Sequence, residues 1–120
     1  MAEIDEVEII GGEPRVPLEE LRDRIREYLA GTSVMRGVLF GSFARGDADA
    51  VSDIDLMLIE PTTLPVLERG LQHLPLFTLG VGVDLLIYTP EEYERLKREG
   101  NAFIECVERE GVTIYARRES

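Results

Sequence analysis

Apolar residues recur along this chain at two spacings, and each spacing predicts one kind of secondary structure. Spacing of three and four residues after Pro17 predicts an amphipathic helix that ends near Gly31. Pro17 suits the first turn of that helix, where a backbone N–H would have no partner. The apolar face of the helix consists of Leu18, Leu21, Ile25, Tyr28 and Leu29.

Unbroken apolar runs predict the strands, and three of them span residues 34–40, 54–59 and 83–88. The run 54–59 continues without a polar break after Asp55, which is typical of a central strand that is covered on both faces. Residues 112–115 form a shorter run and predict a last strand near a sheet edge.

The remaining segments predict further helices. Residues 62–73 favour a helix that internal proline and glycine weaken, and residues 74–82 favour a connection. The sequence Thr-Pro-Glu-Glu at 89–92 has the form of a capping box with proline at the first helical position. A second helix is expected from Gly100 to about residue 110. This order of elements predicts an α+β fold in two layers, with a mixed sheet and helices mainly on one face.

The length of the chain indicates how it divides into domains. With 120 residues, of which 44% are hydrophobic, one domain with its own core is expected over residues 17–120. Residues 1–16 contain short apolar stretches that Gly11-Gly12 and Pro14 interrupt. We expect an N-terminal arm there, and a short strand is the alternative.

Composition limits the classes of binding partner and the cellular location that can be expected for this protein. The net charge of −11 weighs against direct nucleic-acid binding, which needs a basic face. No apolar run approaches the ~20 residues of a membrane span, and the acidic start is unlike a signal peptide, so a cytoplasmic location is expected. Cys106, the only cysteine, is interpreted as a small core side chain in the last helix. His73, the only histidine, is interpreted as an ordinary polar residue on a helix face.

Two aspartates mark the start of the predicted central strand. Residues two apart in a strand point to the same face, so Asp53 and Asp55 should project together with Cα atoms ~6.6 Å apart. Carboxylates at this spacing can share magnesium ions. A turn residue at the start of a strand would account for Asp53, but it would not account for Asp55 between apolar neighbours.

Asp84 is a third acidic candidate, because it interrupts the apolar run 83–88. A lone acid in such a strand is costly unless it is paired or bound to a metal. Strand pairing could place Asp84 beside Asp55. An exposed position at the strand end is the alternative interpretation.

The loop before the central strand favours phosphate binding. Gly41 lets the backbone approach a phosphate closely, and Ser42 adds a hydroxyl to the N–H groups of the turn. Arg45 is either a further phosphate contact or a surface arginine paired with Asp47 or Asp49.

These residues carry a resemblance to a known family. Gly41-Ser42, ten intervening residues and Asp53-x-Asp55 resemble the signature of the DNA polymerase β-like nucleotidyltransferases. The fuller form, Gly-Ser-Phe-Ala-Arg-Gly followed by Ser-Asp-Ile-Asp-Leu, is similar to the minimal nucleotidyltransferases, many of which act as antitoxins beside a helical HEPN-type toxin. With Asp84, the resemblance covers roughly residues 34–116 and implies a nucleotidyltransferase fold.

The resemblance implies a particular reaction. ATP would be the donor and a tyrosine of the cognate HEPN toxin the acceptor, so that the toxin is silenced by attached AMP. Asp53, Asp55 and Asp84 would hold two Mg²⁺ ions, and Asp84 would be the likeliest base. No second domain to grip the acceptor is expected within these 120 residues, so a partner or a second copy is expected to complete the site. The alternative is a non-catalytic antitoxin that masks the surface of its partner.

Overall fold

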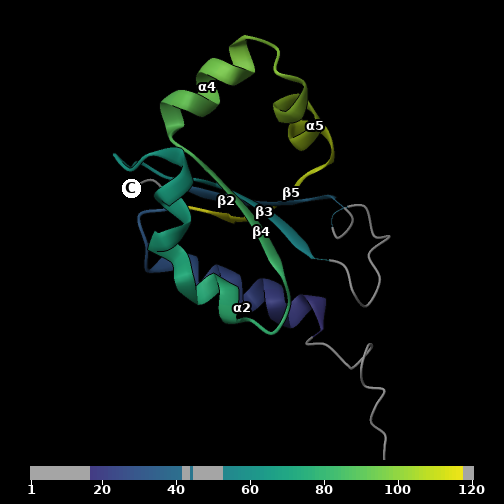
Figure 1. The fold of residues 1–120 in the computed structure, drawn as a ribbon. Helices are drawn as coiled ribbons and strands as arrows, with labels where there is room; N and C mark the ends of the chain where they lie inside the picture. Colours follow the sequence, from purple (N-terminus) through teal and green to yellow (C-terminus); the bar gives the residue numbers. More distant parts are fainter. Residues whose placement is uncertain (1–16, 42–43, 45–52, 118–120) are drawn as a thin grey trace, which may run out of the picture.

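A computed structural model describes residues 17–41, 44 and 53–117 of the chain. Its four strands form one sheet in the order β4-β3-β2-β5 (Figure 1). The strands are β2 (Arg36–Phe40), β3 (Ile54–Ile59), β4 (Val83–Tyr88) and β5 (Val112–Ala116). β3 pairs in parallel with β4, whereas β2 pairs antiparallel with both β3 and β5. The predicted α+β fold with a mixed sheet is confirmed, and so is the central position of the run 54–59.

Helices cover both faces of this sheet, which differs from the expectation that they lie mainly on one. α2 (Leu18–Ala30) and the 3₁₀ segment η1 (Val66–Thr78) cover one face, whereas α4 (Pro90–Arg98) and α5 (Ala102–Glu110) cover the other (Figure 1). The physical reason lies in β3. Leu56 and Leu58 pack with α2 residues, whereas Met57 and Ile59 pack with α4 and α5 residues. Because both faces of this strand are apolar, each requires a cover.

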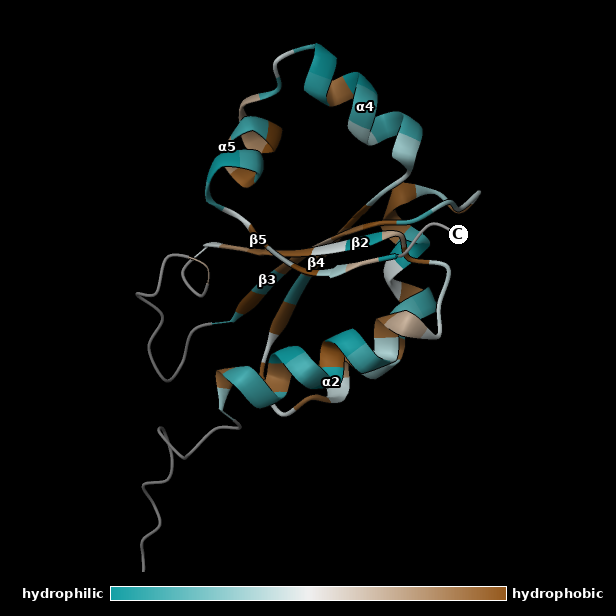
Figure 2. Cartoon of the chain, turned by 180° about the vertical axis from the view of Figure 1, so that it is seen from behind, coloured by the Kyte–Doolittle hydropathy of each residue, from teal (hydrophilic) through white to brown (hydrophobic). Residues whose placement is uncertain are grey.

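The distribution of hydrophobic residues matches this layered arrangement of sheet and helices. The strands are mostly hydrophobic, while α2 and α4 are largely hydrophilic with separate hydrophobic positions (Figure 2). In α2 those positions include Leu21, Ile25 and Leu29, which are buried as their spacing predicts. In the described part of the chain, no helix has the length and apolar character that would let it cross a lipid bilayer.

The segment η1 is the main correction to the predicted helices. It covers residues 66–78, so it begins later than the predicted helix and occupies much of the expected connection. Its two helical pieces meet at a kink at His73, where φ is −131° and ψ is 41°. Pro65 precedes the first piece, and Pro75 lies near the start of the second, where a missing N–H costs little. The prolines therefore mark helix starts rather than a loop.

The predicted capping box is confirmed at the start of α4. The Glu92 backbone N–H donates to the Thr89 hydroxyl at 3.1 Å, and the Thr89 N–H donates to the Glu92 carboxylate at 2.9 Å. After Gly100, which has a φ of +71°, the Asn101 side chain caps α5 by accepting from the Ile104 N–H. The interpretation of Cys106 is wrong, because its half-buried thiol lies near the Glu110 carboxylate rather than in the core.

Candidate functional site: carboxylates at the start of two parallel strands

The register of the sheet brings two of the predicted carboxylates onto neighbouring strands. Asp55 is the second residue of β3 and pairs directly with Asp84, the second residue of β4. Paired residues of parallel strands project from the same face, so both carboxylates lie on the face that α4 and α5 cover farther along the sheet. Asp84 is exposed and Asp55 is half-buried. The predicted juxtaposition of Asp55 with Asp84 is therefore present.

Glycines make room for the aspartate side chains. Gly41 directly follows β2, has a φ of +74°, and lies against the Asp55 carboxylate. Gly82, just before β4, lies in the same way against the carboxylate of Asp53. A Cβ atom at either glycine would overlap the neighbouring carboxylate oxygen. The site thus depends on two close approaches between backbone and carboxylate. The sequence analysis expected Gly41 to approach a phosphate and indicated neither of these contacts.

The structure does not describe all of the predicted site residues. Ser42 and Arg45 lie outside the described residues, as does the N-terminal arm predicted over 1–16. Among the residues that the structure describes, no three Asp, Glu, His or Cys side chains are grouped as a metal site. The donor chemistry nevertheless fits magnesium, because Asp53, Asp55 and Asp84 offer carboxylate oxygens at the same edge of the sheet. The metal-binding role of these residues stays a prediction.

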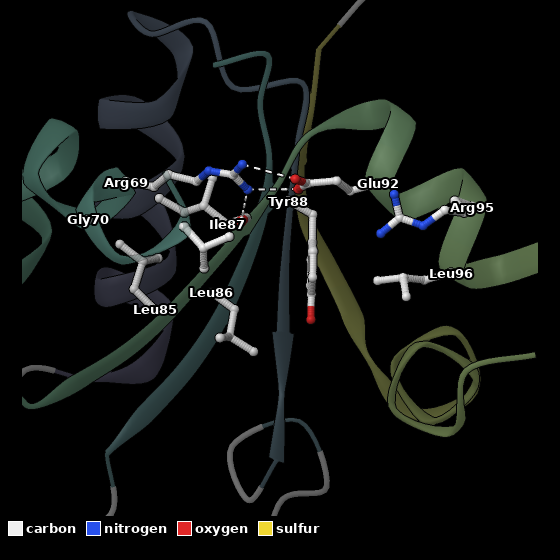
Figure 3. A pocket seen from close by; sticks show the side chains of 10 residues that line it. Arg69, Gly70, Leu85, Leu86, Ile87, Tyr88, Glu92, Arg95 and Leu96 are labelled. Atoms are coloured by element: carbon white, nitrogen blue, oxygen red, sulfur yellow. Dashed lines mark hydrogen bonds and ion pairs between the residues drawn. The ribbon is translucent and has the colours of Figure 1, made fainter. Parts of the chain in front are cut away.

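Apart from the carboxylates, a concave region lies along the outer edge of β4 (Figure 3). It is a cavity of about 230 Å³ between η1, β4 and α4. Arg69 of η1 crosses it and donates two hydrogen bonds to the Glu92 carboxylate, at 2.7 and 2.9 Å. The same guanidinium donates to the Ile87 carbonyl oxygen at 3.0 Å. One buried arginine thus joins η1, the edge strand and α4.

This network changes the ionisation of Glu92. Hydrogen bonds from Arg69 lower the pKa of the Glu92 carboxyl to about 2, with help from the Thr89 N–H and against the cost of burial. Glu92 therefore serves both the helix cap and the ion pair. Sequence reasoning identified the cap but missed the ion pair, because only the tertiary structure brings Arg69 to the first turn of α4.

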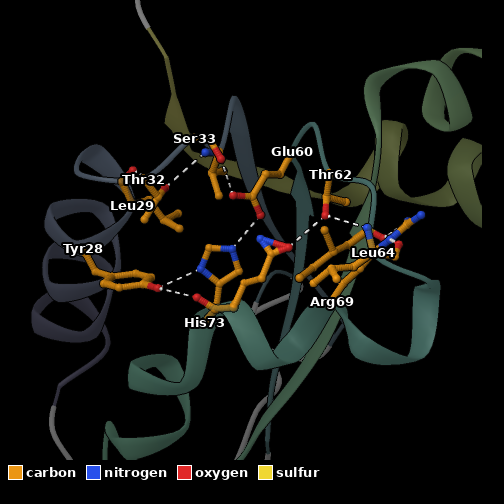
Figure 4. Close-up of polar contacts among 12 residues, drawn as sticks. Tyr28, Leu29, Thr32, Ser33, Glu60, Thr62, Leu64, Arg69 and His73 are labelled. Atoms are coloured by element: carbon orange, nitrogen blue, oxygen red, sulfur yellow. Dashed lines mark hydrogen bonds and ion pairs between the residues drawn. The ribbon is translucent and has the colours of Figure 1, made fainter.

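A buried polar chain fixes the other side of η1 (Figure 4). His73 Nε2 lies 2.6 Å from Glu60 Oε1, and His73 Nδ1 lies 2.7 Å from the Tyr28 hydroxyl. The Ser33 hydroxyl donates to the other Glu60 oxygen at 2.6 Å. Burial, and secondarily the charge of Glu60, raises the pKa of Tyr28. The interpretation of His73 as an ordinary polar residue on a helix face is wrong, since its side chain is only 2% exposed and both ring nitrogens have side-chain partners.

A known protein family matches most of the chain. The family model described as "Nucleotidyltransferase domain" matches residues 18–116. Comparison with curated proteins gives no match.

Among solved structures, a toxin–antitoxin complex with AMP-PNP has a TM-score of 0.59 and 22% identity, and the match covers 81% of this chain and 74% of that one. A putative nucleotidyltransferase from Sulfolobus solfataricus has a TM-score of 0.56 and 22% identity, over 82% and 79% of the two chains. A complex of tri-AMPylated Shewanella oneidensis HEPN toxin with MNT antitoxin has a TM-score of 0.54 and 19% identity, over 82% and 72%. At these identities the likeness shows a shared fold.

The close approach at Gly41 generates a prediction with a matched control. Gly41→Ala and Gly80→Ala both place a side chain at positive φ, but open space surrounds Gly80 whereas Asp55 faces Gly41. We expect Gly80→Ala to lower the free energy of unfolding by about 1 kcal/mol, the cost of the left-handed backbone. Gly41→Ala should cost clearly more, because the Asp55 side chain must also move. Urea denaturation of both variants measures the difference, and equal losses would contradict the contact.

The depressed pKa of Glu92 generates a prediction about acid stability. The ionised carboxylate stabilises the fold above the ordinary glutamate pKa near 4.5, and that contribution is lost as the pH falls toward about 2. Glu92→Gln should therefore cost roughly 2 kcal/mol at pH 7 and much less at pH 2. Chemical denaturation at both pH values checks this, with the exposed neighbour Glu91→Gln as the control. A pH-independent cost for Glu92→Gln would contradict the ion pair.

Proposed function

The chain belongs to the nucleotidyltransferase domain family, and from that premise we propose that it transfers AMP from ATP to a hydroxyl acceptor in a magnesium-dependent reaction. The observation that carries this proposal is the pairing of Asp55 with Asp84 across the parallel strands, with Gly41 against the Asp55 carboxylate. Two acids and a tight glycine turn at one edge of a sheet suit a phosphate that carries a metal ion.

Each residue has a distinct role in this proposal. Asp53, Asp55 and Asp84 would hold Mg²⁺, which would offset the charge of the triphosphate and favour ionisation of the acceptor hydroxyl. The backbone at Gly41 and the Ser42 hydroxyl bind the phosphates, and Arg45 adds a charged contact to them.

In the proposed reaction, one proton is transferred and pyrophosphate is released. A carboxylate oxygen of the exposed Asp84 accepts the proton of the acceptor hydroxyl. The acceptor oxygen forms a bond to the α-phosphorus, and the bond from that phosphorus to the bridging oxygen of the β-phosphate breaks. Pyrophosphate leaves and AMP stays on the acceptor.

We further propose that the acceptor is a tyrosine of a HEPN-type toxin, which this chain would silence as an antitoxin. This proposal draws on the structural neighbour in which a tri-AMPylated HEPN toxin is bound to an MNT antitoxin. It also fits the exposure of the site, since the exposed side chains of Asp53 and Asp84 leave space for a protein acceptor. The rival function is neutralisation by masking, in which an acidic chain of net charge −11 docks on a basic toxin without chemistry.

One assay separates the two functions. Purified protein is mixed with ATP labelled at the α-phosphate, Mg²⁺ and the protein encoded by the adjacent gene. We expect covalent label on that protein, reduced about a hundredfold or more by Asp55→Asn or Asp84→Asn because an essential charge at the reacting phosphate is lost. Asp23→Asn, on the exposed face of α2, is the matched control and should retain full transfer.

The possible outcomes discriminate between the proposals. Toxin activity that is neutralised without label, and equally well by both carboxylate variants, would support masking and contradict catalysis. Label that persists in both variants would contradict the assigned roles of Asp55 and Asp84.

A further inference from the structure

The segment η1 has its polarity reversed relative to an ordinary surface helix. Its buried side chains include Arg69 and His73, and both have their polar atoms paired with Glu92, Glu60 and other partners. Leu76 is buried in the core, but the other large apolar side chains of η1 point outward. The exposed ones are Val66, Leu67, Leu71, Leu74 and Phe77.

This exposure is too extensive to be incidental. Leu67 is 96% exposed and Leu71 is 66% exposed, and both belong to one 13-residue segment. Burying such a side chain is favourable, and monomeric proteins rarely leave large apolar patches open. The outward face of η1 therefore has the composition of an interface core rather than of a free surface.

The charge around this face identifies what can cover it. Residues 62–83 contain one acidic residue, Glu68, and one basic residue, Arg69, so their formal charge is zero. The remainder of the chain carries the whole net charge of −11. Arg69 is already paired with Glu92, which leaves Glu68 as the exposed charge of η1.

A face of η1 with a single exposed charge, that of Glu68, is compatible with an occupant that is itself acidic. A basic partner would gain most from the acidic surfaces, where opposite charges can meet. A second copy of this chain also carries −11, so it should approach through a surface of low charge, which limits like-charge repulsion. We propose that the outward face of η1 (Val66, Leu67, Leu71, Leu74 and Phe77) is the contact surface between two copies of this chain, related by a two-fold axis.

This contact leaves the candidate site accessible. η1 packs with α2 on one face of the sheet, whereas Asp55 and Asp84 project from the other face. The inference therefore stands independently of the proposed transfer reaction. Loss of the dimer and loss of AMP transfer are expected from different variants.

The mass of the protein in solution tests the inference. Sedimentation equilibrium over 1–100 μM, a range of about a hundredfold chosen to bracket micromolar affinities, should show a dimer of twice the 13.5 kDa chain mass. Leu67→Glu and Leu71→Glu each place a charge in the contact, so each should raise the dimer Kd by about tenfold or more. Val112→Glu adds the same charge to another partly exposed apolar residue, on β5, and should leave the dimer Kd unchanged. Circular dichroism confirms that each variant is folded.

Salt dependence gives a second readout. Raised NaCl screens the repulsion between two chains of −11, so the wild-type dimer should become tighter. The inference would be overturned if the wild-type protein were still a monomer at about 100 μM, the highest concentration tested. A dimer whose Kd is unchanged by both leucine substitutions, or one that salt weakens, would also overturn it.

Discussion

The parallel pairing of β3 with β4 is the contact on which the candidate site depends. It aligns Asp55 with Asp84, although 28 residues separate them in the chain, and it places Gly82 against Asp53. A shift of this register by one residue would send one carboxylate to the opposite face of the sheet. The apolar side chains that alternate with Asp55 prevent such a shift, because Ile54 and Leu56 are fully buried in the core shared with α2.

The opposite ends of the same strands are held by polar contacts. Glu60, which follows β3, meets His73, while Arg69 reaches Ile87 near the end of β4. Both networks draw polar side chains of η1 inward, and each buried group is paired, as its desolvation requires. With its inward positions occupied by Arg69 and His73, η1 presents most of its leucines to solvent. The stability of the strand ends and the apolar outer surface thus have a common structural origin.

Much of this arrangement is predictable from local patterns. The helix after Pro17, the strands at 54–59 and 83–88 and the cap at Thr89 follow from periodicity and turn chemistry, which depend on neighbouring residues. The error at His73 concerns a residue whose role depends on distant partners. His73 has no sequence neighbour that predicts burial, and its partners Tyr28 and Glu60 come from other elements. The distribution of the helices over both faces also depends on which side of the sheet each connection crosses.

By itself, the sequence determined the element types, the acidic character of the chain and the spacing of Gly41, Asp53 and Asp55, because these are properties of short stretches and of composition. Only the tertiary structure decided that Asp84 lies beside Asp55, that Arg69 and His73 are buried, and that Leu67 and Leu71 face solvent. The physical reason is that strand register and the burial of a polar group result from long-range pairing. Hydrophobic spacing identifies an apolar face, but it does not say whether that face meets the sheet or the surface of another molecule.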